Sequence, residues 1–175
     1  MKGSGSVWVF SRMKRRSSAV LALLMMGTFL AGCQGSMLTA KGHALDKTRQ
    51  IMISKGGQQS GQYVSGDLSI NYQYTRSADS LQIAGVVQFD SSISGNYNTI
   101  NHFELSLMLA DAQGTVLKQQ VLTSADDNNP STPINFSVTL SLPAQCESMA
   151  FAYEGQVSGV GTGPVSIGRY PVNEL

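Results

Sequence analysis

Few residues in this chain of 175 could carry out catalysis, and they lie far apart in the sequence. The chain has two histidines, His43 and His102, and two cysteines, Cys33 and Cys146. A zinc site needs three or four nitrogen or sulfur ligands, and an activated nucleophile needs a base beside it. The spacing of these residues supports neither arrangement. We therefore expect two surface imidazoles, no metal site, no cofactor and no enzymatic activity.

Cys146 lacks the surroundings of a reactive thiol. It follows Pro143 and precedes Glu147, with no cation nearby in the sequence that would lower the pKa of its thiol. Free cysteine is among the most buried residue types, so we expect a buried and inert side chain. An intermolecular disulfide and a reactive nucleophile are the alternatives for an unpaired cysteine in an exported protein.

The run Asp126-Asp127-Asn128-Asn129 is the best candidate for a ligand-binding edge. Its oxygen-rich side chains could bind Ca²⁺ loosely, but it lacks the spaced ligands and the final glutamate of an EF-hand loop. The run also fits a solvated hairpin tip that ends at Pro130, and we expect that structure. Loops of this kind carry recognition in many β-proteins.

The N-terminal part of the chain has the pattern of an export signal. Residues 19–30 are uncharged and follow the basic run Lys14-Arg15-Arg16. A helix of this length would span roughly 18 Å, which is shorter than the roughly 30 Å hydrocarbon core of a membrane. The pattern therefore predicts a secretory signal rather than a permanent transmembrane helix. Residues from Met13 onward form a compact signal by themselves, so we take Met13 as the predicted start.

The signal ends in Leu30-Ala31-Gly32-Cys33, which resembles the lipobox of bacterial lipoproteins. The resemblance implies diacylglycerol transfer to the Cys33 sulfur, cleavage between Gly32 and Cys33, and acylation of the new amino group, so that the protein is held at the membrane by a lipid anchor. Gln34 stands where an aspartate commonly retains Gram-negative lipoproteins in the inner membrane. In a Gram-negative source the resemblance therefore implies the outer membrane, with the domain facing the periplasm.

The charges are segregated along the chain. Five of the 12 basic residues lie within 1–32, which contain no acid, so 7 basic and 11 acidic residues remain from Cys33 onward. This balance argues against nucleic-acid binding, which needs clustered cations. The glycine-rich, polar run 54–61 is typical of a flexible linker. We predict a lipidated tether over residues 33–60 and a folded domain over 61–175, with a short first strand at 51–53 as an alternative.

Apolar and polar residues alternate with period two through most of the predicted domain, which is typical of half-buried strands. The clear runs lie at 68–75, 81–89, 103–109 and 134–142, and weaker ones at 115–122, 148–153 and 165–170. About seven short strands predict a single antiparallel β-sandwich. Its size and rhythm resemble the immunoglobulin and fibronectin type III class, although the disulfide and the core tryptophan are absent. Residues 159–164 are expected to form a flexible loop.

The leading functional hypothesis is a non-catalytic module that binds an envelope protein or organises the envelope. A small-ligand or glycan-binding lipoprotein that uses Tyr63, Tyr97 and Tyr170 is the alternative. No arrangement of catalytic residues supports a hydrolase, since no Gly-x-Ser-x-Gly motif occurs. A flat, exposed strand edge would favour protein partners that bind by strand addition.

Overall fold

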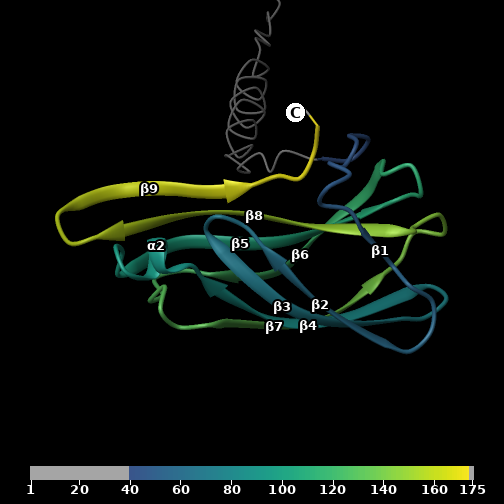
Figure 1. Cartoon of the computed structure of the whole chain (residues 1–175), viewed down its shortest axis with the longest axis horizontal. Coiled ribbons are helices and arrows are strands. Elements are labelled where there is room, and N and C mark those ends of the chain that lie inside the picture. Colours follow the sequence, from purple (N-terminus) through teal and green to yellow (C-terminus); the bar gives the residue numbers. More distant parts are fainter. Residues whose placement is uncertain (1–39, 174–175) are drawn as a thin grey trace, which may run out of the picture. The chain divides into compact units, whose positions relative to one another are not determined.

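A computed structural model describes residues 40–173, and it confirms the predicted all-β sandwich (Figure 1). The described part of the chain contains nine strands and one short helix, whereas about seven strands were predicted. The strands are β1 (Ile51–Met52), β2 (Gln58–Val64), β3 (Leu68–Arg76), β4 (Ser80–Phe89), β5 (Thr99–Ala110), β6 (Val116–Ala125), β7 (Ile134–Ser141), β8 (Ser148–Gly159) and β9 (Thr162–Arg169). The helix α2 (Ser91–Ser94) begins where the Asp90 carboxylate accepts a hydrogen bond from the Ser92 amide.

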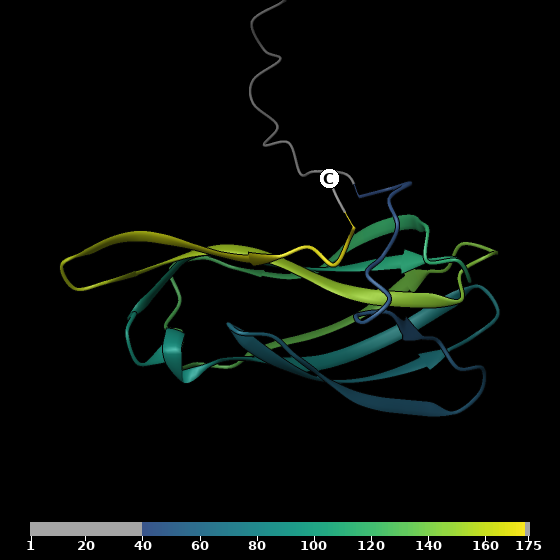
Figure 2. The ribbon, with the colours of Figure 1, turned by 45° about the horizontal axis from the view of Figure 1, so that its top comes forward.

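The strands form two antiparallel sheets that lie as separate layers in Figure 2. The four-stranded sheet has the order β2-β3-β4-β7. The five-stranded sheet has the order β1-β8-β5-β6, and β9 also pairs with β8. Most of the hydrophobic core lies between the two layers, where Phe103, Phe151 and Tyr153 are almost fully buried.

The period-two pattern correctly identifies the residues that face this core. In β3 the side chains of Leu68, Ile70, Tyr72 and Tyr74 are buried, while the residues between them are half-buried or exposed. Successive side chains of a strand point to opposite faces, so one apolar face is enough to attach the strand to the sandwich. The same alternation orders β4 and β7.

A second hydrophobic cluster covers the outer face of β5 and β8, so the ordered unit begins before Gly61. It joins Met108 of β5 and Ala150 of β8 to Ala40 and Leu45. Leu45 is only 2% exposed, and it forms a β-bridge with Val172. The boundary predicted at Gly61 is therefore too late for the described residues, because residues 40–60 supply part of the apolar cover of this sheet.

Two segments predicted to be flexible are parts of strands or turns. The predicted linker at 54–61 contains the start of β2, an edge strand whose exposed positions are polar except for Val64. Polarity alone cannot distinguish such a strand from a linker. The predicted loop at 159–164 consists of the end of β8, a tight turn and the first residues of β9, and Gly161 in the turn adopts a positive φ of 77° that glycine tolerates best.

Tyr153 ties the two sheets together, and its substitution gives a test of the packing. Its hydroxyl donates a 2.7 Å hydrogen bond to the Asp67 carboxylate in the β2–β3 turn and lies 2.8 Å from the Ser65 hydroxyl. Burial raises the pKa of Tyr153, so the donor stays protonated at neutral pH. We expect Tyr153→Phe to lower the free energy of unfolding by about 1.5–3 kcal/mol, the range for a hydrogen bond to a charged group. Urea denaturation would measure this loss, and unchanged stability would contradict the role of the contact.

Candidate functional site

The predicted ligand-binding loop forms an ordered turn beside β5. The backbone of Asn128 exchanges hydrogen bonds with Ile100, at 2.6 and 3.2 Å. Asp127 adopts a positive φ of 53°, and the Asn129 side chain accepts a hydrogen bond from the Ser131 amide. The side chains of Asp126, Asp127, Asn128 and Asn129 are exposed. A ligand edge at this loop stays a prediction, since these contacts describe a turn and do not define a cavity.

The other residues singled out by type do not converge on a site. His102 lies 2.7 Å from the Asp126 carboxylate on the surface, measured from Nδ1 to Oδ1. Within residues 40–173, no group of three or more His, Cys, Asp or Glu residues is placed to hold a metal ion. Cys146 is fully buried as predicted, and burial raises the pKa of its thiol. The lipobox residues Leu30, Ala31, Gly32 and Cys33, and the predicted start Met13, lie outside the described residues. No helix in the described part of the chain is long and apolar enough to cross a membrane.

The tyrosines proposed for glycan binding do not form an exposed platform. Tyr63 is 5% exposed and belongs to the main core, with the Arg49 guanidinium carbon 5.8 Å from its ring centroid. Tyr97 is half-buried against the same core. The hydroxyl of Tyr170, which is also half-buried, donates a 2.7 Å hydrogen bond to Glu154. These positions therefore serve packing rather than ligand stacking.

A surface that sequence reasoning missed is the outer face of the four-stranded sheet. The strand register aligns its outward side chains in rows that run across the sheet. From β2 to β7 the rows are Gln58-Thr75-Gln82-Thr139, Ser60-Gln73-Ala84-Ser137 and Gln62-Asn71-Val86-Asn135, and a further row starts with Val64-Ser69-Gln88. We call these residues the amide face. None of them carries a charge, although both signs occur elsewhere in the domain.

Most polar side chains of the amide face are free to bond a ligand. Gln58 donates to Gln73, but the amide groups of Gln62, Asn71 and Asn135 make no hydrogen bond to any residue within 40–173. Each amide offers two donors and one acceptor oxygen. The face therefore presents several unused hydrogen-bonding groups without an ionisable one.

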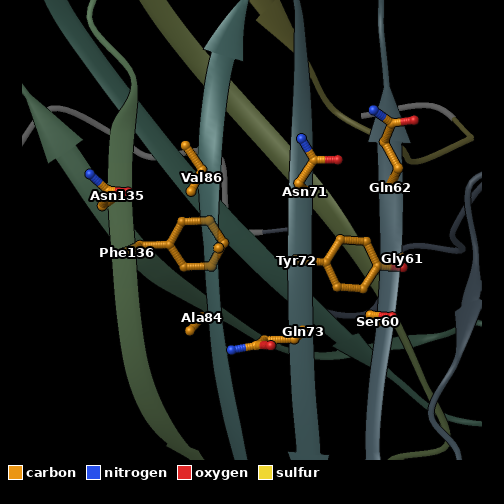
Figure 3. Close-up of a pocket in the computed structure, with 11 residues that line it drawn as sticks. Ser60, Gly61, Gln62, Asn71, Tyr72, Gln73, Ala84, Val86, Asn135 and Phe136 are labelled. Atoms are coloured by element: carbon orange, nitrogen blue, oxygen red, sulfur yellow. The ribbon is translucent and has the colours of Figure 1, made fainter.

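An open hollow of about 630 Å³ lies at the centre of this face (Figure 3). The small side chains of Ser60, Ala84 and Val86 leave this space, and longer amide side chains border it. Beneath the sheet, the rings of Tyr72 and Phe136 fill the room left by two glycines. A Cβ on Gly61 would lie 2.5 Å from the Tyr72 hydroxyl, and one on Gly85 would lie 2.7 Å from Phe136 Cζ.

The hollow is lined by uncharged side chains. Its lining residues are Ser60, Gly61, Gln62, Asn71, Tyr72, Gln73, Ala84, Gly85, Val86, Asn135 and Phe136. They include no carboxylate, imidazole or thiol that would serve as a general acid, base or activated nucleophile. Burial raises the pKa of Tyr72, so its hydroxyl stays neutral. The site can donate and accept hydrogen bonds, and it can bury a partner's surface without desolvating a charge.

The outward-facing residues of the predicted strands already indicated part of the amide face. The polar residues of 68–75 and 134–142 are Asn, Gln, Ser and Thr throughout. Their convergence required the strand order and register, and β2 was not among the predicted strands. The fold and this face define a β-sandwich with one uncharged outer surface.

Comparison with protein-family models finds no match, and comparison with curated proteins finds none either. Among solved structures, the chain matches the solution NMR structure of yajI, an uncharacterised lipoprotein from Escherichia coli. The sequences are 12% identical, the match covers 93% of this chain and 90% of that one, and the TM-score is 0.28.

Proposed function

We propose that this protein is a membrane-anchored bacterial lipoprotein whose β-sandwich is a non-catalytic binding module for another envelope protein. The observation that supports this function is the amide face: rows of uncharged, hydrogen-bonding side chains around an open hollow. Protein surfaces usually mix charges of both signs, whereas the centres of interfaces are depleted of charge. A partner docking here would desolvate amides and hydroxyls, and the partner's polar groups would replace their water.

The lipid anchor would contribute by confinement. The lipobox resemblance places the acylated Cys33 at the end of the mature chain, so the domain stays close to one membrane. Confinement raises the effective concentration toward neighbouring envelope proteins, and modest contacts then suffice for binding. The role of this module would be to hold a partner at the membrane rather than to transform it.

A small polar ligand such as a glycan is the second candidate. The hollow and its amides favour it, because sugar hydroxyls bond well to such groups. The described residues supply no exposed aromatic platform for it, since Tyr63, Tyr97 and Tyr170 pack into the domain. A protein partner therefore fits the extent of the face better than a single sugar would.

Site-specific photo-crosslinking in living cells tests the proposed function. A photo-reactive amino acid at Gln73 or Asn135 should capture the same envelope protein, and one at Gln113, exposed in the β5–β6 turn, should not. Ala84→Glu places a charge in the hollow and should reduce capture at Gln73, whereas Ala112→Glu in the distant turn should not. Equal capture at Gln73 and Gln113, or capture insensitive to Ala84→Glu, would contradict the proposal. Capture of glycan only would favour the second candidate.

A further inference from the structure

The strand β2 forms one edge of the amide face, and its outer side has no strand partner among the described residues. Within residues 40–173 it pairs only with β3, from Gln58↔Thr75 to Val64↔Ser69. Edge strands expose a row of backbone N–H and C=O groups on which another chain can pair. The orientation of these groups decides which residues of β2 are available.

The turn between β2 and β3 fixes that orientation. The Ser65 amide donates a 2.9 Å hydrogen bond to the Leu68 carbonyl, so these two residues form a hydrogen-bonded pair. Antiparallel ladders alternate hydrogen-bonded and non-hydrogen-bonded pairs. Gln58, Ser60, Gln62 and Val64 therefore point their backbone groups away from β3. An independent contact agrees with this assignment, because Arg49 Nη1 donates to the Val64 carbonyl at 3.0 Å from the free side.

The edge lacks the devices that usually block strand addition. Natural edges carry lysine, proline, bulges or inward charges, but β2 reads Gln-Gln-Ser-Gly-Gln-Tyr-Val and its register with β3 is regular. The outer strand β9, by contrast, contains Pro164 and Arg169, and its pairing with β8 is irregular. Strand addition would thus be permitted at β2 and hindered at β9.

Cations stand at both ends of the open edge. Arg49 lies at the Val64 end, and exposed Lys55 precedes the Gln58 end. Acids near these cations are engaged within the domain: Asp46, which lies near Arg49, accepts hydrogen bonds from Thr48, Glu147 pairs with Arg76 at 3.7 Å, and Asp67 bonds to Tyr153. A symmetric antiparallel pairing of two copies would put Arg49 of one copy beside Lys55 of the other. This repulsion disfavours a second copy and favours a partner that carries carboxylates.

We propose that β2 binds an extended segment of a partner protein by strand addition, and that this segment has an uncharged centre with acidic residues at both ends. The proposal rests on the proposed function and specifies how the partner is held. Backbone pairing at Gln58, Ser60 and Gln62 would provide the contact along the edge. Arg49 and Lys55 would attract the flanking acids, and the adjacent amide face would contact the rest of the partner.

Binding of defined peptides to the mature, full-length lipoprotein in an uncharged maltoside detergent tests this inference. The probe is a fluorescent peptide with the sequence DETVTVTVED, and the comparisons are KKTVTVTVKK and a DETVTVTVED peptide N-methylated at alternate central residues. Fluorescence anisotropy measures affinity, and hydrogen exchange followed by NMR reports the protected amides. We expect the acidic peptide to bind and to slow exchange at Gln58, Ser60 and Gln62. N-methylation should weaken binding roughly tenfold or more, because backbone hydrogen bonds are lost.

Charge variants test the two ends of the edge. Arg49→Gln and Lys55→Gln should each weaken the acidic peptide roughly two- to fivefold at low salt, as expected for exposed ion pairs. The matched control Lys41→Gln changes an exposed lysine near β6 and should leave affinity unchanged. Thermal melts would show that the variants remain folded.

The possible outcomes separate this inference from the function it rests on. Failure of every peptide to bind, while crosslinking at Gln73 persists, would overturn strand addition and leave the binding module intact. Protection at amides outside β2, or protein dimers that protect the same amides without peptide, would also overturn it. If no partner is crosslinked at Gln73 while the acidic peptide still binds, the result would contradict binding at the amide face but support strand addition at the β2 edge.

Discussion

Gly85→Ala is expected to lower the free energy of unfolding by about 1–3 kcal/mol, the range for overpacking a well-packed interior. Gly85 lies in β4, opposite Tyr72 of β3 and Phe136 of β7. A Cβ there would lie 2.5 Å from the backbone oxygen of Asn71 and 2.7 Å from Phe136 Cζ. The Phe136 ring can rotate away, but the Asn71 carbonyl belongs to a central strand and cannot move without disturbing the sheet.

Gly163→Ala provides the matched control for this substitution. A Cβ at Gly163 meets nothing within 4 Å, and the residue has no positive φ. The change should therefore leave stability within about 0.5 kcal/mol, as for a surface substitution. Urea denaturation followed by circular dichroism compares the two variants with the wild type. Equal stability of Gly85→Ala and Gly163→Ala would show that β3, β4 and β7 do not approach as closely as described.

Cys33→Ala is expected to abolish lipid attachment and signal cleavage completely. The lipobox resemblance makes the Cys33 sulfur the acceptor of the diacylglyceryl group, and alanine has no nucleophilic atom in that place. The variant should accumulate as an uncleaved precursor that incorporates no labelled fatty acid. Intact mass and metabolic labelling with a palmitate analogue would measure both effects.

Cys146→Ala is the control for loss of a cysteine. Cys146 is buried beneath the β-sandwich surface and lies far from the predicted cleavage point in the sequence. Its replacement should leave acylation and cleavage intact while lowering stability modestly. Normal processing of Cys33→Ala would refute the lipobox interpretation. Loss of processing in Cys146→Ala as well would point to a general folding or export defect.

The local patterns were sufficient to predict the sandwich, because a strand with one buried face has apolar residues at every second position. Leu68, Ile70, Tyr72 and Tyr74 alternate with polar residues, and all four are buried. The turn at Asp111–Gly114 is likewise held by local residues, since the Asp111 carboxylate accepts hydrogen bonds from the Gln113 and Thr115 amides. Such features depend on residues that are close in sequence.

Other features depended on residues that are distant in sequence. Met108 sits at an outward position of β5 and yet is fully buried, because Leu45 and its neighbours cover it. β2 was missed since an edge strand with polar outward residues looks like a linker. A single strand's polar residues say nothing about which other strands lie beside them.

The sequence by itself determined the strand periodicity, and it predicts the export signal and the acylation motif, because each is encoded in a continuous run of residues. Only the tertiary structure brought Ser60, Asn71, Ala84 and Asn135 together around one hollow, since four separate strands contribute them. It also decided that the β2 edge, between Arg49 and Lys55, has no strand partner in the part of the chain that the structure describes. Strand order and register are properties of the whole sandwich, and they made a continuous amide face out of dispersed polar residues.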